Sequence, residues 1–178
     1  MNDLQALLDT ATEAAHAAGE LIQSNFGSEL TVNEMQRHDI KLELDVRSQK
    51  LITDMILAKF PEHAILGEEG GDTGGDGPIE WIVDPIDGTV NYFFGIPHFC
   101  VSIAARERDT KKLLIGVIFD PMQKETFSVK AGGTTLLTQT YRPEEKNKAQ
   151  GAMDTCVFST MMVSSFASGA LITTQGWT

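Results

Sequence analysis

The chain carries the stretch Trp81-Ile82-Val83-Asp84-Pro85-Ile86-Asp87-Gly88-Thr89, which joins an apolar segment to two acids. The apolar residues 79–83 predict a strand that delivers Asp84 at its carboxyl edge. Pro85 fixes its own φ and has no N–H to donate, so the chain is expected to turn sharply there. Asp84 and Asp87 can then face a common point.

A second acidic turn precedes this stretch. Glu68 stands sixteen residues before Asp84 and follows the apolar run Ala64-Ile65-Leu66, so it too is expected where a strand ends. Carboxylates, together with a backbone carbonyl such as that of Ile86, are the oxygen ligands that Mg²⁺ prefers. Acids from two segments also suit a pair of cations, as in-line phosphate displacement requires. The pattern therefore predicts metal-assisted hydrolysis of a phosphoester.

Gly88 and Thr89 complete the motif. Gly88 supplies permissive backbone angles, and both amides would point at an anion if a helical turn begins here. A plainer interpretation is that Asp84 and Asp87 only cap a turn, as Asp often does. That interpretation leaves Glu68, Glu69 and Thr89 unexplained, so the metal site is favoured.

These residues, taken in order, resemble the first half of the inositol monophosphatase signature. The resemblance covers roughly residues 1–135 and includes Asp45 on a preceding helix. Its motifs are Gly-Glu-Glu at 67–69, Asp-Pro-Ile-Asp-Gly-Thr at 84–89, Asn91-Tyr92, Pro97 and Val101-Ser102-Ile103-Ala104.

The resemblance implies a role for each matching residue. Glu68, Asp84 and the Ile86 carbonyl would hold one Mg²⁺, and Asp84 and Asp87 would contribute to a second. Thr89, hydrogen-bonded to Asp45, would orient and deprotonate the attacking water. The implied catalytic set is Thr89, Asp45 and Glu68, the substrate-binding set is Gly88, Thr89 and Asp87, and Glu69 is an acid outside the ligand set that orients ligands or waters.

The second half of that signature is missing. The family's later Trp-Asp motif supplies another carboxylate to the second metal, whereas the only later tryptophan here, Trp177, is followed by Thr178. The expected fold is therefore α/β: the first layer of the family's layered α-β sandwich, with two N-terminal helices and a mainly antiparallel sheet. We expect a metal-binding domain over 1–135 and, over 136–178, the truncated start of the second half.

Hydrophobic periodicity places the elements. Helical spacing predicts helices over 3–26 and 44–59. The Gly-rich residues 70–78 are expected to form a flexible acidic loop. Short apolar runs between turn residues predict strands over about 63–67, 79–84, 98–106, 113–119 and 125–130.

Charge and targeting signals limit the partners. A formal net charge of −11 disfavours a nucleic-acid partner, so a phosphate substrate would be attracted by bound cations. The N-terminus has no basic stretch followed by an apolar core, and the apolar tail is interrupted by Ser and Thr. We expect a cytoplasmic protein with no membrane partner, whose partner is a small phosphomonoester. An uncovered apolar face would favour self-association, including a homodimer.

Two functions from different classes follow. The first is Mg²⁺-dependent hydrolysis of a small phosphomonoester, with inositol monophosphate implied by the resemblance. The second is a catalytically incompetent half-module that binds Mg²⁺ weakly, because the third carboxylate is missing.

Overall fold

The computed structural model describes residues 3–28, 32–36, 39–69, 71–131 and 136–137. The chain divides into two units, Met1–Thr138 and Gln139–Thr178. The second unit lies outside the described residues, so the predicted division into domains near residue 135 stays a prediction.

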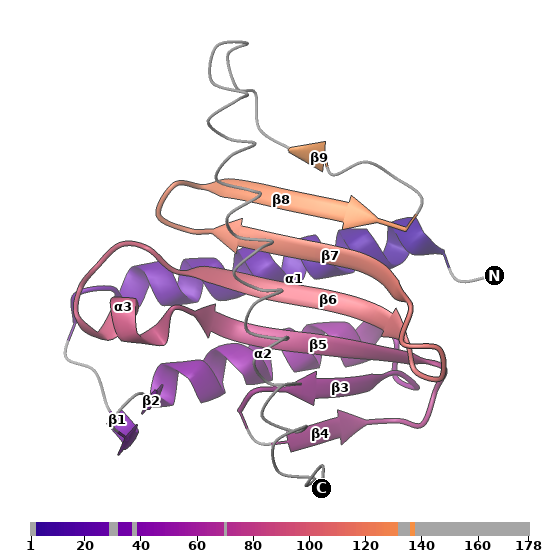
Figure 1. The fold of residues 1–178 in the computed structure, drawn as a ribbon, viewed down its shortest axis with the longest axis horizontal. Helices are drawn as coiled ribbons and strands as arrows, with labels where there is room; N and C mark the ends of the chain where they lie inside the picture. The colour runs from indigo at the N-terminus through magenta and orange to yellow at the C-terminus, as the bar shows by residue number, and fades with distance from the viewer. Residues whose placement is uncertain (1–2, 29–31, 37–38, 70, 132–135, 138–178) are drawn as a thin grey trace, which may run out of the picture. The chain divides into compact units, whose positions relative to one another are not determined.

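The described residues of the first unit form three helices, a seven-stranded mixed sheet and a separate two-stranded pair, β1 and β2 (Figure 1). The large sheet has the order β4-β3-β5-β6-β7-β8-β9. Only β3 and β5 run parallel among its described strands, so the expected mainly antiparallel sheet is confirmed. The elements are α1 Leu4–Asn25, β1 Val32–Gln36, β2 Asp39–Leu42, α2 Glu43–Lys59, β3 Ala64–Gly67, β4 Gly71–Gly74, β5 Ile79–Asp87, α3 Thr89–Phe93, β6 Cys100–Glu107, β7 Leu113–Asp120, β8 Glu125–Lys130 and β9 Leu136–Leu137.

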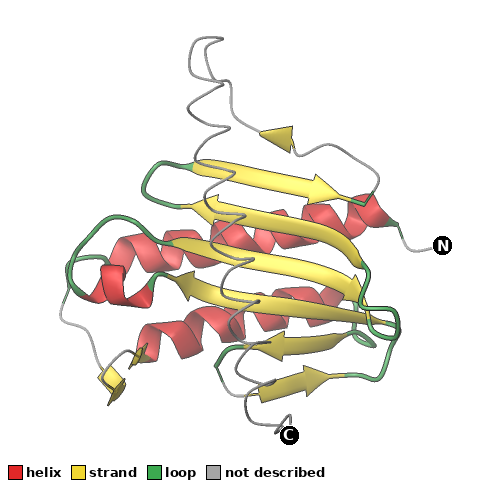
Figure 2. Cartoon of the chain, in the orientation of Figure 1, coloured by secondary structure: helices red, strands yellow, loops and turns green. Residues whose placement is uncertain are grey.

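The two long helices, α1 and α2, lie on one face of the sheet (Figure 2). The Asp3 carboxylate begins α1 by accepting hydrogen bonds from the amides of Gln5 and Ala6. Small residues let this helix approach the sheet closely: a Cβ at Gly19 would lie 2.4 Å from the Phe119 ring. The buried stripe of α1 includes Ala11, Ala14, Ala15 and Ala18.

Strand β5 alternates between the two faces of the sheet. Ile79, Trp81 and Val83 are buried, which leaves Glu80, Ile82 and Asp84 on the other face. The buried Trp81 indole donates to His63 Nδ1 over 3.0 Å, so its N–H is satisfied inside the core. This anchoring fixes the strand that presents Asp84.

The two predicted helices and the five predicted strands are present, but the end of β5 differs from prediction. The strand does not end at Asp84. Asp84 pairs with Ser102 and Asp87 pairs with Cys100, so β5 has one residue more than β6 between these pairs. Pro85, which cannot donate to a ladder, is accommodated in a β-bulge instead of a turn.

The expected loop over 70–78 is wrong in part, because Gly71–Gly74 forms β4 and pairs with β3. Glycine has low strand propensity, so no strand is predicted over these residues. Backbone contacts hold this segment: the amides of Gly75 and Gly77 donate to the carbonyls of His63 and Glu62. Strands β1 and β2 were likewise not predicted. Among the described helices, none is both long and apolar enough to cross a membrane.

Candidate metal centre

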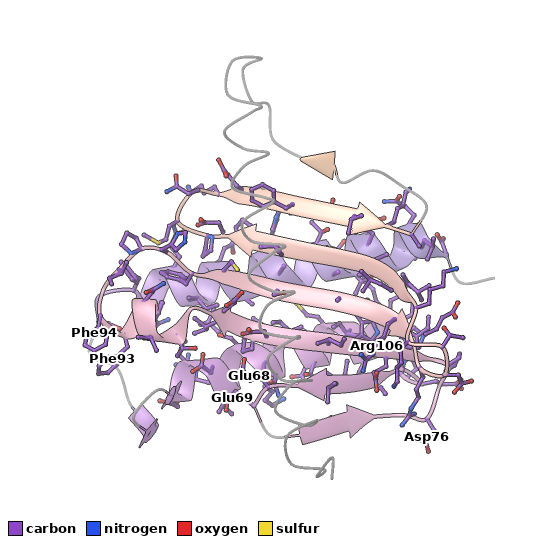
Figure 3. The ribbon with its side chains drawn as sticks, in the orientation of Figure 1. Glu68, Glu69, Asp76, Phe93, Phe94 and Arg106 are labelled. Carbon is purple, nitrogen blue, oxygen red and sulfur yellow. The ribbon has the colours of Figure 1, made fainter. Side chains whose placement is uncertain are left out.

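Glu68 directly follows β3, and Asp84 lies at the corresponding point of the neighbouring parallel strand, β5. Gly67 pairs with Val83, and each acid is the next residue along its own chain segment. The Glu68 amide donates to the Val83 carbonyl over 3.2 Å, which continues the pairing up to the acids. Figure 3 shows Glu68 and Glu69 at the end of the sheet nearest α3, whereas Arg106 and Asp76 lie at the opposite end.

Burial and negative charge act together on Asp84. Loss of solvent, followed by the charges of Glu68 and Asp87, raises the pKa of Asp84 to about 8, and a hydrogen bond with Glu68 acts in the same direction. The Ile86 amide opposes the shift by favouring the charged form. Asp84 Oδ1 is buried, and no group in the described part of the chain hydrogen-bonds to it. Asp84 Oδ1 thus lies near the Glu68 carboxylate without a hydrogen-bond donor or cation among the described residues.

Asp87 contributes less directly. It lies exposed at the end of β5, and its Oδ2 accepts a hydrogen bond from the Cys100 thiol over 3.8 Å. Across the described ranges, no group of three or more His, Cys, Asp or Glu side chains is arranged to hold a metal ion. The structure therefore brings Glu68 and Asp84 together, while Asp87 acts on Asp84 through its charge.

The bulge and the start of α3 arrange Ile86, Gly88 and Thr89. Gly88 precedes α3 with a φ of +98°, which permits the abrupt change from strand to helix. The Thr89 hydroxyl donates to the Ile86 carbonyl over 2.9 Å. A carbonyl oxygen has two lone pairs, so Ile86 can accept this bond and still offer a ligand.

Asp45 reaches the same region from the first turn of α2. It is only 3% exposed. Burial, and then the charge of Asp45, raises the pKa of Tyr92 in α3 to about 12, so the acid lies close to that helix. The predicted hydrogen bond between Asp45 and Thr89 stays a prediction. In this structure the Thr89 hydroxyl donates its proton to the Ile86 carbonyl.

One residue at the site was not predicted. The Gln49 side chain accepts a hydrogen bond from the Glu69 amide over 2.7 Å and donates to the Glu69 carbonyl. A signal was present in the sequence: Gln49 is one helical turn after Asp45 and so lies on the same face of α2. The predicted role of the Glu69 carboxylate stays a prediction.

The donor set fits a hard divalent cation. Two carboxylates and a carbonyl are oxygen ligands of the kind that Mg²⁺ takes, and Mg²⁺ ordinarily keeps several waters. A cation here would neutralise the mutual repulsion of Glu68 and Asp84 and give the unpartnered Asp84 Oδ1 a partner. The full ligand set with Ile86 and Asp87 stays a prediction.

Known proteins with similar sequences point to one family. Residues 3–174 match the model of the inositol monophosphatase family. The protein named Nus factor SuhB is 34% identical over 154 residues in Haemophilus influenzae, covering 84% of this chain and 57% of that protein. Its counterpart in Pseudomonas aeruginosa is 35% identical over 156 residues, again covering 84% of this chain and 57% of that protein.

Solved structures agree with the sequences. The extragenic suppressor protein SuhB from Bartonella henselae is 31% identical with a TM-score of 0.71, over 75% of this chain and 52% of that one. An IMPase from Thermotoga maritima is 30% identical with a TM-score of 0.67, and the match covers 76% of this chain and 52% of that one. The chain thus spans about half the length of these relatives and shares their fold over that half. By sequence and by fold, this chain belongs to the inositol monophosphatase family.

Proposed function

We propose that the protein takes part in Mg²⁺-dependent hydrolysis of a small phosphomonoester, with inositol monophosphate as the first candidate. Family membership supports a phosphatase. Among similar solved structures, SaIMPase-II is bound to inositol monophosphate in one and to 2'AMP in another. Both ligands are small phosphomonoesters, so the class of substrate is better supported than any one compound.

One observation carries the proposal: Glu68 and Asp84 crowd together at adjacent parallel positions, and a buried Asp84 oxygen there accepts no hydrogen bond from the described residues. Repulsion of this kind is unfavourable unless something positive offsets it. A capped turn without a ligand does not need two carboxylates at this spacing. A cation-binding role explains both the crowding and the unpartnered oxygen.

The reaction transfers a phosphoryl group from an alcohol to water. A bond forms between the water oxygen and phosphorus, the ester P–O bond breaks, and the departing alcohol oxygen takes a proton. Glu68, Asp84 and the Ile86 carbonyl would hold a first Mg²⁺, with Asp84 and Asp87 contributing to a second. When bound, Mg²⁺ would activate water and offset negative charge on the leaving oxygen.

The remaining roles fall to groups around the start of α3. The Thr89 hydroxyl would orient the attacking water and take its proton while giving its own proton to the Asp45 carboxylate. The Gly88 and Thr89 amides and Asp87 would contact the substrate. We further propose that the protein acts in the cytoplasm on a dissolved substrate and that homodimers form, without nucleic-acid or membrane partners.

Phosphate release from inositol 1-phosphate tests this proposal. The purified chain should release phosphate with Mg²⁺ and lose this activity in Asp84→Asn. Asp54→Asn is the matched control, because Asp54 is an exposed acid of α2 paired with Lys50. Turnover that Asp84→Asn leaves unchanged would reject the assignment.

A second candidate is a half-module that binds Mg²⁺ weakly and does not turn over substrate. The absence of a three-acid metal group among the described residues favours it. Calorimetric titration separates the two candidates. Two bound cations in the presence of phosphate would contradict the half-module, and weak binding of one without turnover would support it.

A further inference from the structure

Gln49 joins helix α2 to the backbone of the acidic turn. Its side chain is largely buried, and both of its polar atoms bind one residue: Oε1 accepts from the Glu69 amide over 2.7 Å and Nε2 donates to the Glu69 carbonyl. A carboxamide can donate and accept at once, as a neighbouring strand would. The pair of bonds therefore fixes the position of the Glu69 backbone relative to α2.

Gly67 makes room for this contact. A Cβ at position 67 would lie 2.3–2.5 Å from the Nε2, Cδ and Oε1 atoms of Gln49. Gly67 is not among the glycines with positive φ, so its backbone does not require glycine. A side chain at position 67 would therefore have to displace the Gln49 amide.

Glu68 stands between these two held residues. On one side, Gly67 pairs with Val83 and packs against Gln49. On the other side, Glu69 is held by both bonds of Gln49, and the Glu68 amide itself donates to the Val83 carbonyl. With both neighbours fixed, the Glu68 backbone has little freedom to move away from Asp84.

The geometry points to Gln49 as a positioning residue, which holds the Glu68 carboxylate beside Asp84. This inference rests on the proposed function and deepens it. Gln49 touches neither Asp84 nor a substrate group in the contacts described; it acts through the Glu69 backbone. Asp45 lies one turn earlier on α2. The same helix would therefore position both Asp45, the proposed water-orienting acid, and the turn that carries Glu68.

A purely structural role would produce a different result. In that case, loss of the Gln49 bonds would lower the stability of the fold and leave cation affinity unchanged. Gln23 provides a matched comparison, because its Nε2 donates over 2.8 Å from α1 to the Pro121 carbonyl, in a turn between β7 and β8. Methionine replaces either glutamine with similar length and no hydrogen bonds.

The test measures Mn²⁺ binding to the full chain, with the electron paramagnetic resonance signal of free Mn²⁺ as the readout. Mn²⁺ suits the same oxygen ligands as Mg²⁺. Gln49→Met should weaken Mn²⁺ binding by about tenfold or more, as removal of groups that orient metal ligands commonly does. Gln23→Met should leave the affinity unchanged although it too loses a helix-to-turn bond. Equal affinity in folded Gln49→Met and the unmodified chain would overturn the inference.

Gly67→Ala keeps the inference testable if Gln49→Met does not fold. The new methyl group should displace the Gln49 amide and weaken Mn²⁺ binding. In a Gln49→Ala background, where the amide is gone, Gly67→Ala should have no further effect. Unchanged Mn²⁺ affinity in Gly67→Ala would overturn the inference. An unmodified chain that binds no Mn²⁺ would instead overturn the proposed function, and the positioning role with it.

Discussion

Glu68 and Asp84 are neighbours because each directly follows one member of the parallel pair formed by Gly67 and Val83. Asp84 lies on the face of β5 opposite the buried residues Ile79, Trp81 and Val83. Glu68, in the turn that directly follows β3, is close enough to hydrogen-bond with it, beside the bulge at Pro85 and Ile86. The pairing of two strands, and not a single loop, creates the proposed cation site.

Asp84 should make the metal-free protein less stable as pH rises. Its pKa is raised to about 8 in the folded chain from an ordinary value of 3.8. Between these two values the folded state binds more protons than the unfolded state, so stability falls as pH increases. Urea unfolding in EDTA between pH 5 and 8 should show this loss.

Asp84→Asn provides the comparison for that pH series, because asparagine does not titrate. The variant should lose less stability than the unmodified chain over the same pH range. Identical slopes in the two proteins would show that Asp84 is not the group responsible.

His63 should stabilise the core through Trp81. His63→Leu removes the acceptor of the buried indole N–H, which should lower the free energy of unfolding by about 1–3 kcal/mol. Adding Trp81→Phe to His63→Leu should cost less than Trp81→Phe costs alone, since no N–H is then left unpaired. Strictly additive losses would contradict a hydrogen bond between these side chains.

The same histidine predicts a pH effect of opposite sign to that of Asp84. Burial lowers the pKa of His63, and the nearby Glu62 charge partly opposes this. The unfolded chain therefore binds more protons in the range just below the ordinary value of 6.5, so stability falls as the pH is lowered through that range. The difference between the unfolding free energies of the unmodified chain and His63→Leu, taken at each pH, should isolate this component.

Gly88 should tolerate a side chain less well than Gly95. Both have positive φ, +98° and +71°, but a Cβ at Gly88 would lie 3.1 Å from the His98 carbonyl, whereas nothing lies within 4 Å of one at Gly95. Gly95→Ala should cost about 1–2 kcal/mol from backbone strain alone. Gly88→Ala should cost more in thermal unfolding; equal losses would show that the contact with His98 is relieved without cost.

The sequence predicted the parts that depend on hydrophobic period and on the order of the motif. Helices α1 and α2 have long apolar stripes, and the strands that flank the acids are apolar runs bounded by turn residues. The adjacency of Glu68 and Asp84 could be expected because each follows such a run. Family membership could be inferred from the same residues.

What could not be predicted depends on pairing between distant segments. The bulge at Pro85 depends on the register of β5 against β6. Two of the four residues of β4 are glycine, and the strand is held by its backbone pairing with β3. The two hydrogen bonds between Gln49 and the Glu69 backbone form only because α2 packs against the turn at Glu69. The spacing from Asp45 indicates which face of α2 Gln49 occupies, but it does not indicate that the turn at Glu69 lies against that face.

The central claim is that Glu68 and Asp84 together bind a divalent cation, and calorimetric titration with Mg²⁺ tests it most directly. The full chain and Asp54→Asn should bind Mg²⁺ with the same affinity, whereas Asp84→Asn and Glu68→Gln should each bind it far more weakly. Binding of Mg²⁺ by Asp84→Asn as tightly as by the unmodified chain would contradict the account.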